Sequence, residues 1–112
     1  MKQHDIRLSV ELDDNQLPDK IFWNATDSPT GRLEEAKAFI LGIWDHKQRE
    51  TLRIDLWTKD MTTDDMKRFC IDILGGLSET MRNSTDDEFV SRSIHELCVK
   101  LVSHLQTQNR GE

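Results

Sequence analysis

Hydrophobic and polar residues alternate in two segments near the start of the chain. In residues 5–13 the apolar positions share one face: Ile6, Leu8, Val10 and Leu12. In residues 20–26 every second position is again apolar: Ile21, Trp23 and Ala25. A period of two is typical of a β-strand with one buried face, and the polar turn between the segments contains Pro18, which ends a strand. The pattern predicts an antiparallel hairpin.

A third alternating segment covers residues 51–58. Leu52, Ile54 and Leu56 fall on one face, and Arg53, Asp55 and Trp57 fall on the other. We expect the apolar face to be buried, which turns Trp57 toward solvent.

Three further segments have apolar residues at helical spacing. The first, residues 32–47, follows the break at residues 28–31 and has this stripe: Ala36, Phe39, Ile40, Ile43 and Trp44. The second helix is predicted to begin near Thr62 or Thr63, with this stripe: Met66, Phe69, Cys70, Ile73, Leu74, Leu77 and Met81. The third is predicted to begin near Ser84 and Thr85, with this stripe: Val90, Ile94, Leu97, Cys98, Leu101, Val102 and Leu105. Thr85 and Glu88 match a capping box.

The predicted order of elements is β-β-α-β-α-α. We therefore expect an α+β fold, a two-layer sandwich in which a three-stranded sheet carries the helices on one face. It should form one domain over residues 1–112, with a frayed end from about residue 107. The pattern leaves the strand order open. Gly75 and Gly76 are either a tolerated weakness of the second helix or a point where another backbone approaches closely.

The composition of the chain limits the classes of partner that it is expected to bind. The chain has 112 residues, a net charge of -6 and 36% hydrophobic residues. An acidic domain repels nucleic-acid phosphates and anionic lipid, so we expect neither partner. The sequence has no apolar run long enough to cross a membrane, and no signal-peptide core follows Met1, so we expect a cytoplasmic protein.

No common catalytic or phosphate-binding motif occurs in the sequence, so we expect no enzyme, no cofactor and no metal. Cys70 and Cys98 lie on facing stripes and are interpreted as reduced core residues in contact. A redox-sensitive disulfide and a zinc site with His95 are the alternatives. Asp13, Asp14 and Asp19 are interpreted as a solvated turn, with a calcium site as the alternative.

The pair Asp45–His46 offers an enzymatic alternative. With Arg53 it could form part of a small enzyme or a ligand-binding site. Neighbouring helical residues do not face each other, so an exposed helix end is the preferred interpretation.

The segment from Trp44 to Lys47 and the segment from Glu50 to Met61 resemble the GldC family of gliding-motility-associated proteins. The hairpin agrees with this resemblance through Leu12-Asp13-Asp14, Leu17 to Ile21, Trp23 and Ala25. The resemblance implies a small accessory protein of bacterial gliding motility, without assigned catalytic residues. Together with the missing site chemistry, it favours a non-enzymatic adaptor that contacts other proteins.

The predicted contact surface is the outer face of the sheet, formed by Phe22, Arg53, Asp55 and Trp57. Aromatic residues beside arginine are typical of interaction hot spots. The candidate partners are components of the gliding machinery and a second copy of the chain, which edge strands could pair into a homodimer. The alternative is structural: Trp57 covers a loop or helix end, and Arg53 and Asp55 only pair with each other.

Overall fold

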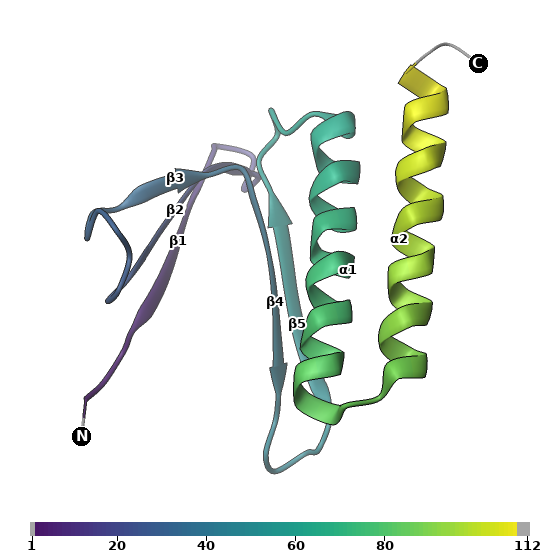
Figure 1. Ribbon diagram of the computed structural model, residues 1–112. Helices are drawn as coiled ribbons and strands as arrows, with labels where there is room; N and C mark the ends of the chain where they lie inside the picture. The colour runs from purple at the N-terminus through teal and green to yellow at the C-terminus, as the bar shows by residue number, and fades with distance from the viewer. Residues whose placement is uncertain (1, 110–112) are drawn as a thin grey trace. The chain divides into compact units, whose positions relative to one another are not determined.

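The computed structural model describes residues 2–109 and has the predicted α+β composition (Figure 1). The chain divides into two compact units, Met1–Thr62 and Thr63–Glu112. In the described part, all strands belong to the first unit and both helices to the second. All three tryptophans, Trp23, Trp44 and Trp57, lie in the first unit.

The first sheet, sheet A, contains β1 (Ile6–Leu12), β2 (Pro18–Ala25) and β3 (Glu34–Ala36) in the antiparallel order β1-β2-β3. The predicted hairpin is confirmed, with Ile6 opposite Ala25 and Val10 opposite Ile21. Its turn is closed by the Asp13 carboxylate, and Gln16 adopts a left-handed conformation with φ 63°.

One face of sheet A is apolar except for Glu34, which lies opposite Trp23. The register brings these residues to it: Leu8, Val10, Ile21, Trp23, Ala25 and Ala36. Ile21 in the central strand is fully buried at 0% exposure, whereas Ile6 at the end of β1 is 79% exposed. The core of this unit is therefore small and centred on β2.

The second sheet, sheet B, is an antiparallel pair of β4 (Ala38–Trp44) and β5 (Thr51–Trp57). The predicted strand at residues 51–58 is confirmed, but it belongs to this separate sheet. The predicted helix over residues 32–47 is wrong, because these residues form β3 and β4. The run Phe39–Trp44 is continuously apolar apart from Gly42, and its aromatic and β-branched residues favour a strand.

The predicted burial of one β5 face is also wrong. Leu52 and Ile54 are each 51% exposed, the same fraction as Trp57 on the opposite face. Their neighbours across the ladder are Ile43 and Leu41, so this face of sheet B is apolar along both strands.

The second unit is a pair of antiparallel helices, α1 (Thr63–Thr85) and α2 (Glu88–Asn109) (Figure 1). The second and third predicted helices are confirmed, but the third begins at Glu88 and not near Ser84 and Thr85, which belong to α1. The predicted capping box is wrong: the Thr85 hydroxyl donates to the Met81 carbonyl, and the Asp87 carboxylate instead accepts the Val90 N–H at 3.1 Å. Asp87 is therefore the residue that caps α2.

Two serines fix the helix pair. Ser78 and Ser91 are buried, and each hydroxyl donates to the other residue's carbonyl, at 2.7 and 2.8 Å. Buried hydroxyls with reciprocal partners specify how the helices face each other. Cys98 is buried and Cys70 is half-buried, and both are free thiols. Contact between them stays a prediction.

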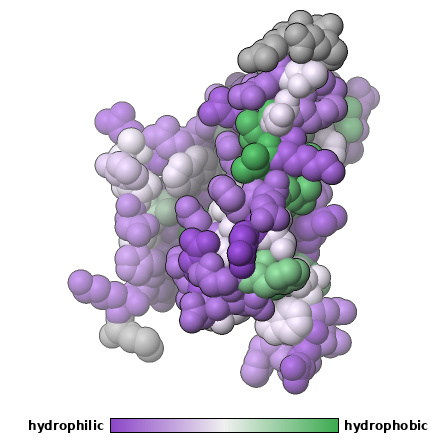
Figure 2. Space-filling model, turned by 45° about the vertical axis from the view of Figure 1, so that its right-hand side comes forward, coloured by the Kyte–Doolittle hydropathy of each residue, from purple (hydrophilic) through white to green (hydrophobic). Residues whose placement is uncertain are grey.

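Two further predictions concern the end of α2 and the glycines of α1. Helix α2 extends to Asn109 and residues 110–112 lie outside the described part, so fraying from about residue 107 stays a prediction. Apart from its own stretch of α1, a Cβ added at Gly75 or Gly76 would meet nothing within 4 Å, so no other backbone in the described part of the second unit approaches either glycine closely. No helix in the described part is long and apolar enough to cross a membrane. Figure 2 shows a largely hydrophilic face with apolar patches between polar side chains.

Candidate functional site

Three of the four predicted surface residues lie on one face of β5. Arg53, Asp55 and Trp57 alternate with the apolar residues of the strand, as expected from its period of two. The Arg53 Nε lies 3.2 Å from Asp55 Oδ2, with the two side chains 71% and 41% exposed. This face therefore presents an ion pair in solvent next to a half-exposed tryptophan.

Phe22, the fourth predicted residue, lies in the other sheet. It is half-buried in β2, on the polar face of sheet A, between Ser9 of β1 and Glu35 of β3. The prediction that one sheet carries all four side chains is wrong, because residues 51–57 pair with β4 and not with the β1–β2 hairpin.

Asp45 and His46 lie in the turn between β4 and β5, not at a helix end as predicted. The Asp45 carboxylate accepts the Gln48 N–H, and its carbonyl accepts the Arg49 N–H at 3.0 Å. Arg49 has a φ of 55°, in the left-handed region that tight turns use. Asp45 therefore shapes the turn, while His46 is exposed.

A shallow hollow of about 350 Å³ adjoins Trp57. Its lining combines the end of β5 with the start of β2: Leu17, Pro18, Asp55, Leu56, Trp57 and Lys59. The apolar part of the lining and the adjacent charges resemble the composition of a protein contact site. Sequence reasoning missed the contribution of Leu17 and Pro18, because it treated that segment only as a turn.

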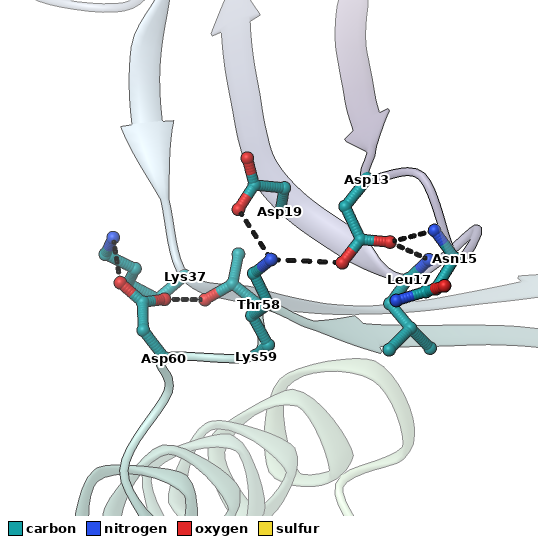
Figure 3. A network of polar contacts seen from close by, with 8 residues as sticks. All are labelled: Asp13, Asn15, Leu17, Asp19, Lys37, Thr58, Lys59 and Asp60. Carbon is teal, nitrogen blue, oxygen red and sulfur yellow. Dashed lines mark hydrogen bonds and ion pairs between the residues drawn. The ribbon is translucent and has the colours of Figure 1, made fainter.

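Lys59 ties the rim of this hollow to the β1–β2 turn (Figure 3). Its Nζ lies 3.0 Å from Asp13 Oδ2 and 3.6 Å from Asp19 Oδ1. Asp13 also accepts the N–H groups of Asn15 and Leu17 at 2.8 and 3.0 Å. The Leu17 N–H first, and then Lys59, hold the pKa of Asp13 below its ordinary value, and Asp13 raises the pKa of Lys59.

A second cluster joins the end of β5 to the start of β4 (Figure 3). Thr58 is fully buried, and its hydroxyl donates to Asp60 Oδ1 at 2.6 Å. Lys37 Nζ lies 3.0 Å from Asp60 Oδ2 and 3.1 Å from Glu35 Oε2. The Thr58 hydroxyl first, and then Lys37, lower the pKa of Asp60, and Asp60 with Glu35 raises the pKa of Lys37.

Main-chain bonds add to this cluster, and we call the segment of residues 58–60 with its partners the Thr58–Asp60 junction. The Thr58 N–H donates to the Lys37 carbonyl at 2.8 Å, and the Lys59 N–H donates to the Pro18 carbonyl at 3.2 Å. The segment directly after Trp57 therefore holds β5 to both β4 and the start of β2. This fixes the position of Trp57 relative to the hollow.

Two of the carboxylates considered as an alternative calcium site instead form ion pairs with Lys59. Asp13 and Asp19 face the Lys59 ammonium, and the Asp13 oxygens are occupied by the bonds described above. Within the described residues, no three His, Cys, Asp or Glu side chains form a group that could hold a metal ion.

Comparison with protein families gives one match over most of the chain. The model described as "Gliding motility-associated protein GldC-like" matches residues 18–107. The chain belongs to the GldC-like family. Comparison with curated proteins and with solved structures gives no match. The GldC-like region extends from β2 to α2, so it contains Trp57 and the whole Thr58–Asp60 junction, while β1 lies before it.

Proposed function

We propose that the chain is a cytoplasmic, non-enzymatic accessory protein of the gliding-motility machinery, and that it acts by contacting another protein. The contact surface is the β5 face formed by Arg53, Asp55 and Trp57, together with the adjoining hollow. Membership of the GldC-like family supports the link to gliding motility. The observation that carries the contact surface is the half-exposed Trp57 beside the hollow.

The energetics of binding favour this surface. A half-exposed tryptophan can still bury a large apolar area when a partner covers it, and tryptophan and arginine are enriched among residues that dominate binding energy. The Thr58–Asp60 junction restricts the end of β5 before any partner binds, which reduces the entropy lost on association. Arg53 and Asp55 add charges at the rim that can select a complementary partner.

The proposal is tested by replacing Trp57 with alanine in a tagged full-length chain. We expect normal circular dichroism and loss of captured gliding-machinery proteins, by about tenfold or more, because a hot-spot tryptophan contributes about 2 kcal/mol or more. Arg53→Glu should weaken capture to a smaller extent. Capture is measured by affinity purification from a gliding bacterium followed by quantitative mass spectrometry.

Trp44→Ala is the matched control. Trp44 is 64% exposed on the same face of sheet B but at its opposite end, across from Thr51. Its removal should leave capture unchanged. If Trp57→Ala folds normally and keeps every partner, this surface is not the functional one. If Trp57→Ala unfolds the first unit, Trp57 is structural.

A further inference from the structure

The outer edge of β5 exposes main-chain groups of two charged residues. The Asp45 N–H donates to Glu50 O at 2.9 Å, and the Thr58 N–H donates to Lys37 O at 2.8 Å. At both ends of the β4–β5 ladder, the main-chain groups of an even-numbered residue, Glu50 or Thr58, therefore point toward the β4 side. Main-chain groups alternate in direction along a strand. Between these ends, the N–H and C=O groups of the even-numbered residues from Leu52 to Leu56 therefore face β4, and those of Arg53 and Asp55 face outward.

An independent bond supports this assignment. Lys59 is an even number of residues from Arg53 and Asp55, so its N–H is expected to point to the same side. This N–H donates to Pro18 O and not to β4. Sheet B has the order β4-β5, so within the described residues β5 has a strand partner on one side only. An unpaired edge is a template for another strand, and a two-stranded sheet is marginally stable alone.

The sequence of β5 is complementary to itself in the antiparallel direction. It reads Thr-Leu-Arg-Ile-Asp-Leu-Trp from Thr51 to Trp57. When two copies are aligned around Ile54, Arg53 of each lies opposite Asp55 of the other. Leu52 of each lies opposite Leu56 of the other, and the two Ile54 side chains meet on the axis.

We propose that the chain forms a homodimer in which β5 pairs with β5 of a second copy around a twofold axis at Ile54. Arg53 and Asp55 of each copy then form main-chain hydrogen bonds across the interface, because their N–H and C=O groups face this edge. Their side chains form two cross-strand ion pairs on one face of the joined sheet. An isologous contact of this kind closes with two copies.

Dimerisation also extends both faces of sheet B. The pairing produces a four-stranded sheet in which the apolar face of each hairpin continues into the other. On the opposite face, the two sets of Arg53, Asp55 and Trp57 lie on one surface. Leu17 and Pro18 border the Trp57 end of β5, so the new ladder is expected to be short, covering residues 52–56. The expected affinity is weak, with a dissociation constant of about micromolar.

Two other edges are less suited to this contact. The β4 edge contains no charge that would select a register. The β1 edge is also self-complementary, with Arg7 and Glu11 placed around Ser9, but the β1–β2 register shifts between Glu11 and Leu12. A bulge of this type twists an edge and hinders pairing. The β5 ladder has no such shift, and its charges already share one face.

The first experiment measures self-association of the purified full-length chain by sedimentation velocity over a range of concentrations. Arg53→Asp gives each copy two acids, and Asp55→Arg gives each copy two arginines. Each single variant places like charges across the interface and should dimerise about tenfold or more weakly than the native chain. An equimolar mixture should form a heterodimer, and the double variant Arg53→Asp/Asp55→Arg should dimerise like the native chain.

The inference rests on the proposed function only in that both use the β5 segment for protein contact. Self-association uses the purified chain, while the proposed function is measured by capture of other proteins, so each can fail alone. A native chain that stays monomeric up to about millimolar overturns the dimer, since a specific contact is populated there. A dimer unaffected by the β5 charges overturns the interface. Loss on Arg7→Glu in place of the β5 variants assigns the contact to β1 and also overturns it.

A second experiment tests the register. Ile54→Cys, in a background with Cys70→Ala and Cys98→Ala, should form an intermolecular disulfide under mild oxidation, because the two side chains meet on the axis at a non-hydrogen-bonded pair. Leu52→Cys is the matched control, with equal exposure but about 14 Å from its twin along the strand direction. Equal cross-linking of both variants overturns the proposed register.

Discussion

Sheet A and sheet B are both antiparallel and belong to the same unit, but their apolar residues are buried to different extents. In sheet A the central strand has a neighbour on each side, and Ile21 is fully buried. In sheet B neither strand is central, and Leu52 and Ile54 stay half-exposed. Burial in this unit therefore follows the position of a strand within its sheet, and not its hydrophobicity alone.

The largest expected effect comes from removing the centre of sheet A. Ile21→Ala should lower the free energy of unfolding by about 2–5 kcal/mol, because it leaves a cavity at a fully buried position. Ile54→Ala removes the same atoms in sheet B and should cost about 1 kcal/mol in the monomer, because Ile54 is 51% exposed. Urea unfolding at low protein concentration measures both values. Equal losses would contradict the contrast between the sheets.

An intermediate effect is expected at the junction between the sheets. Thr58→Val keeps the shape of a fully buried side chain but removes the hydroxyl that donates to Asp60. We expect a loss of about 1–2 kcal/mol, because the bond is to a charged acceptor. Thr58→Ser keeps the hydroxyl and serves as the control. Native stability of the valine variant, measured by thermal unfolding, would mean that this bond does not stabilise the first unit.

The smallest effect is expected from Lys59 and Asp13, which lie at the surface of the same junction. The pKa of Asp13 is lowered, so its stabilisation is complete above the ordinary value of 3.8 and is lost as pH falls through the folded pKa. The pKa of Lys59 is raised, so its contribution is present below 10.5 and is lost as pH rises through the folded pKa. Salt should weaken both contributions.

Lys59→Met separates the causes of these shifts. The pKa of Asp13 should rise in this variant but stay below its ordinary value, because the Leu17 N–H is the larger cause and remains. Carboxyl titration followed by NMR measures this pKa directly. A fully normal Asp13 pKa in Lys59→Met would mean that the turn does not hold the carboxylate as described.

The helices could be predicted from the sequence because each repeats its apolar spacing over many turns. Residues 32–47 could not be assigned in the same way. Ala36, Phe39, Ile40, Ile43 and Trp44 fit a helical stripe, yet Leu41 lies outside it and makes the run continuous, which suits a strand. The spacing alone does not separate the two interpretations, and pairing with β5 decides between them.

The candidate site was predictable only where it depends on neighbouring residues. Alternation alone put Arg53, Asp55 and Trp57 on one face. The pairing of Asp13 with Lys59 joins residues 46 positions apart, and no local pattern signals it. Phe22 was assigned to the wrong sheet for a related reason, since alternation gives a side chain its face but not the strand beside it.

The location of the tryptophans gives each unit its own spectroscopic signal. All three lie in the first unit, and the chain has no tyrosine, so intrinsic fluorescence reports on the strands alone. The helical signal in far-ultraviolet circular dichroism arises from α1 and α2 in the second unit. In one unlabelled sample, tryptophan fluorescence therefore follows unfolding of the first unit, and circular dichroism follows unfolding of the helices. A difference between the two melting temperatures would show that the units unfold independently.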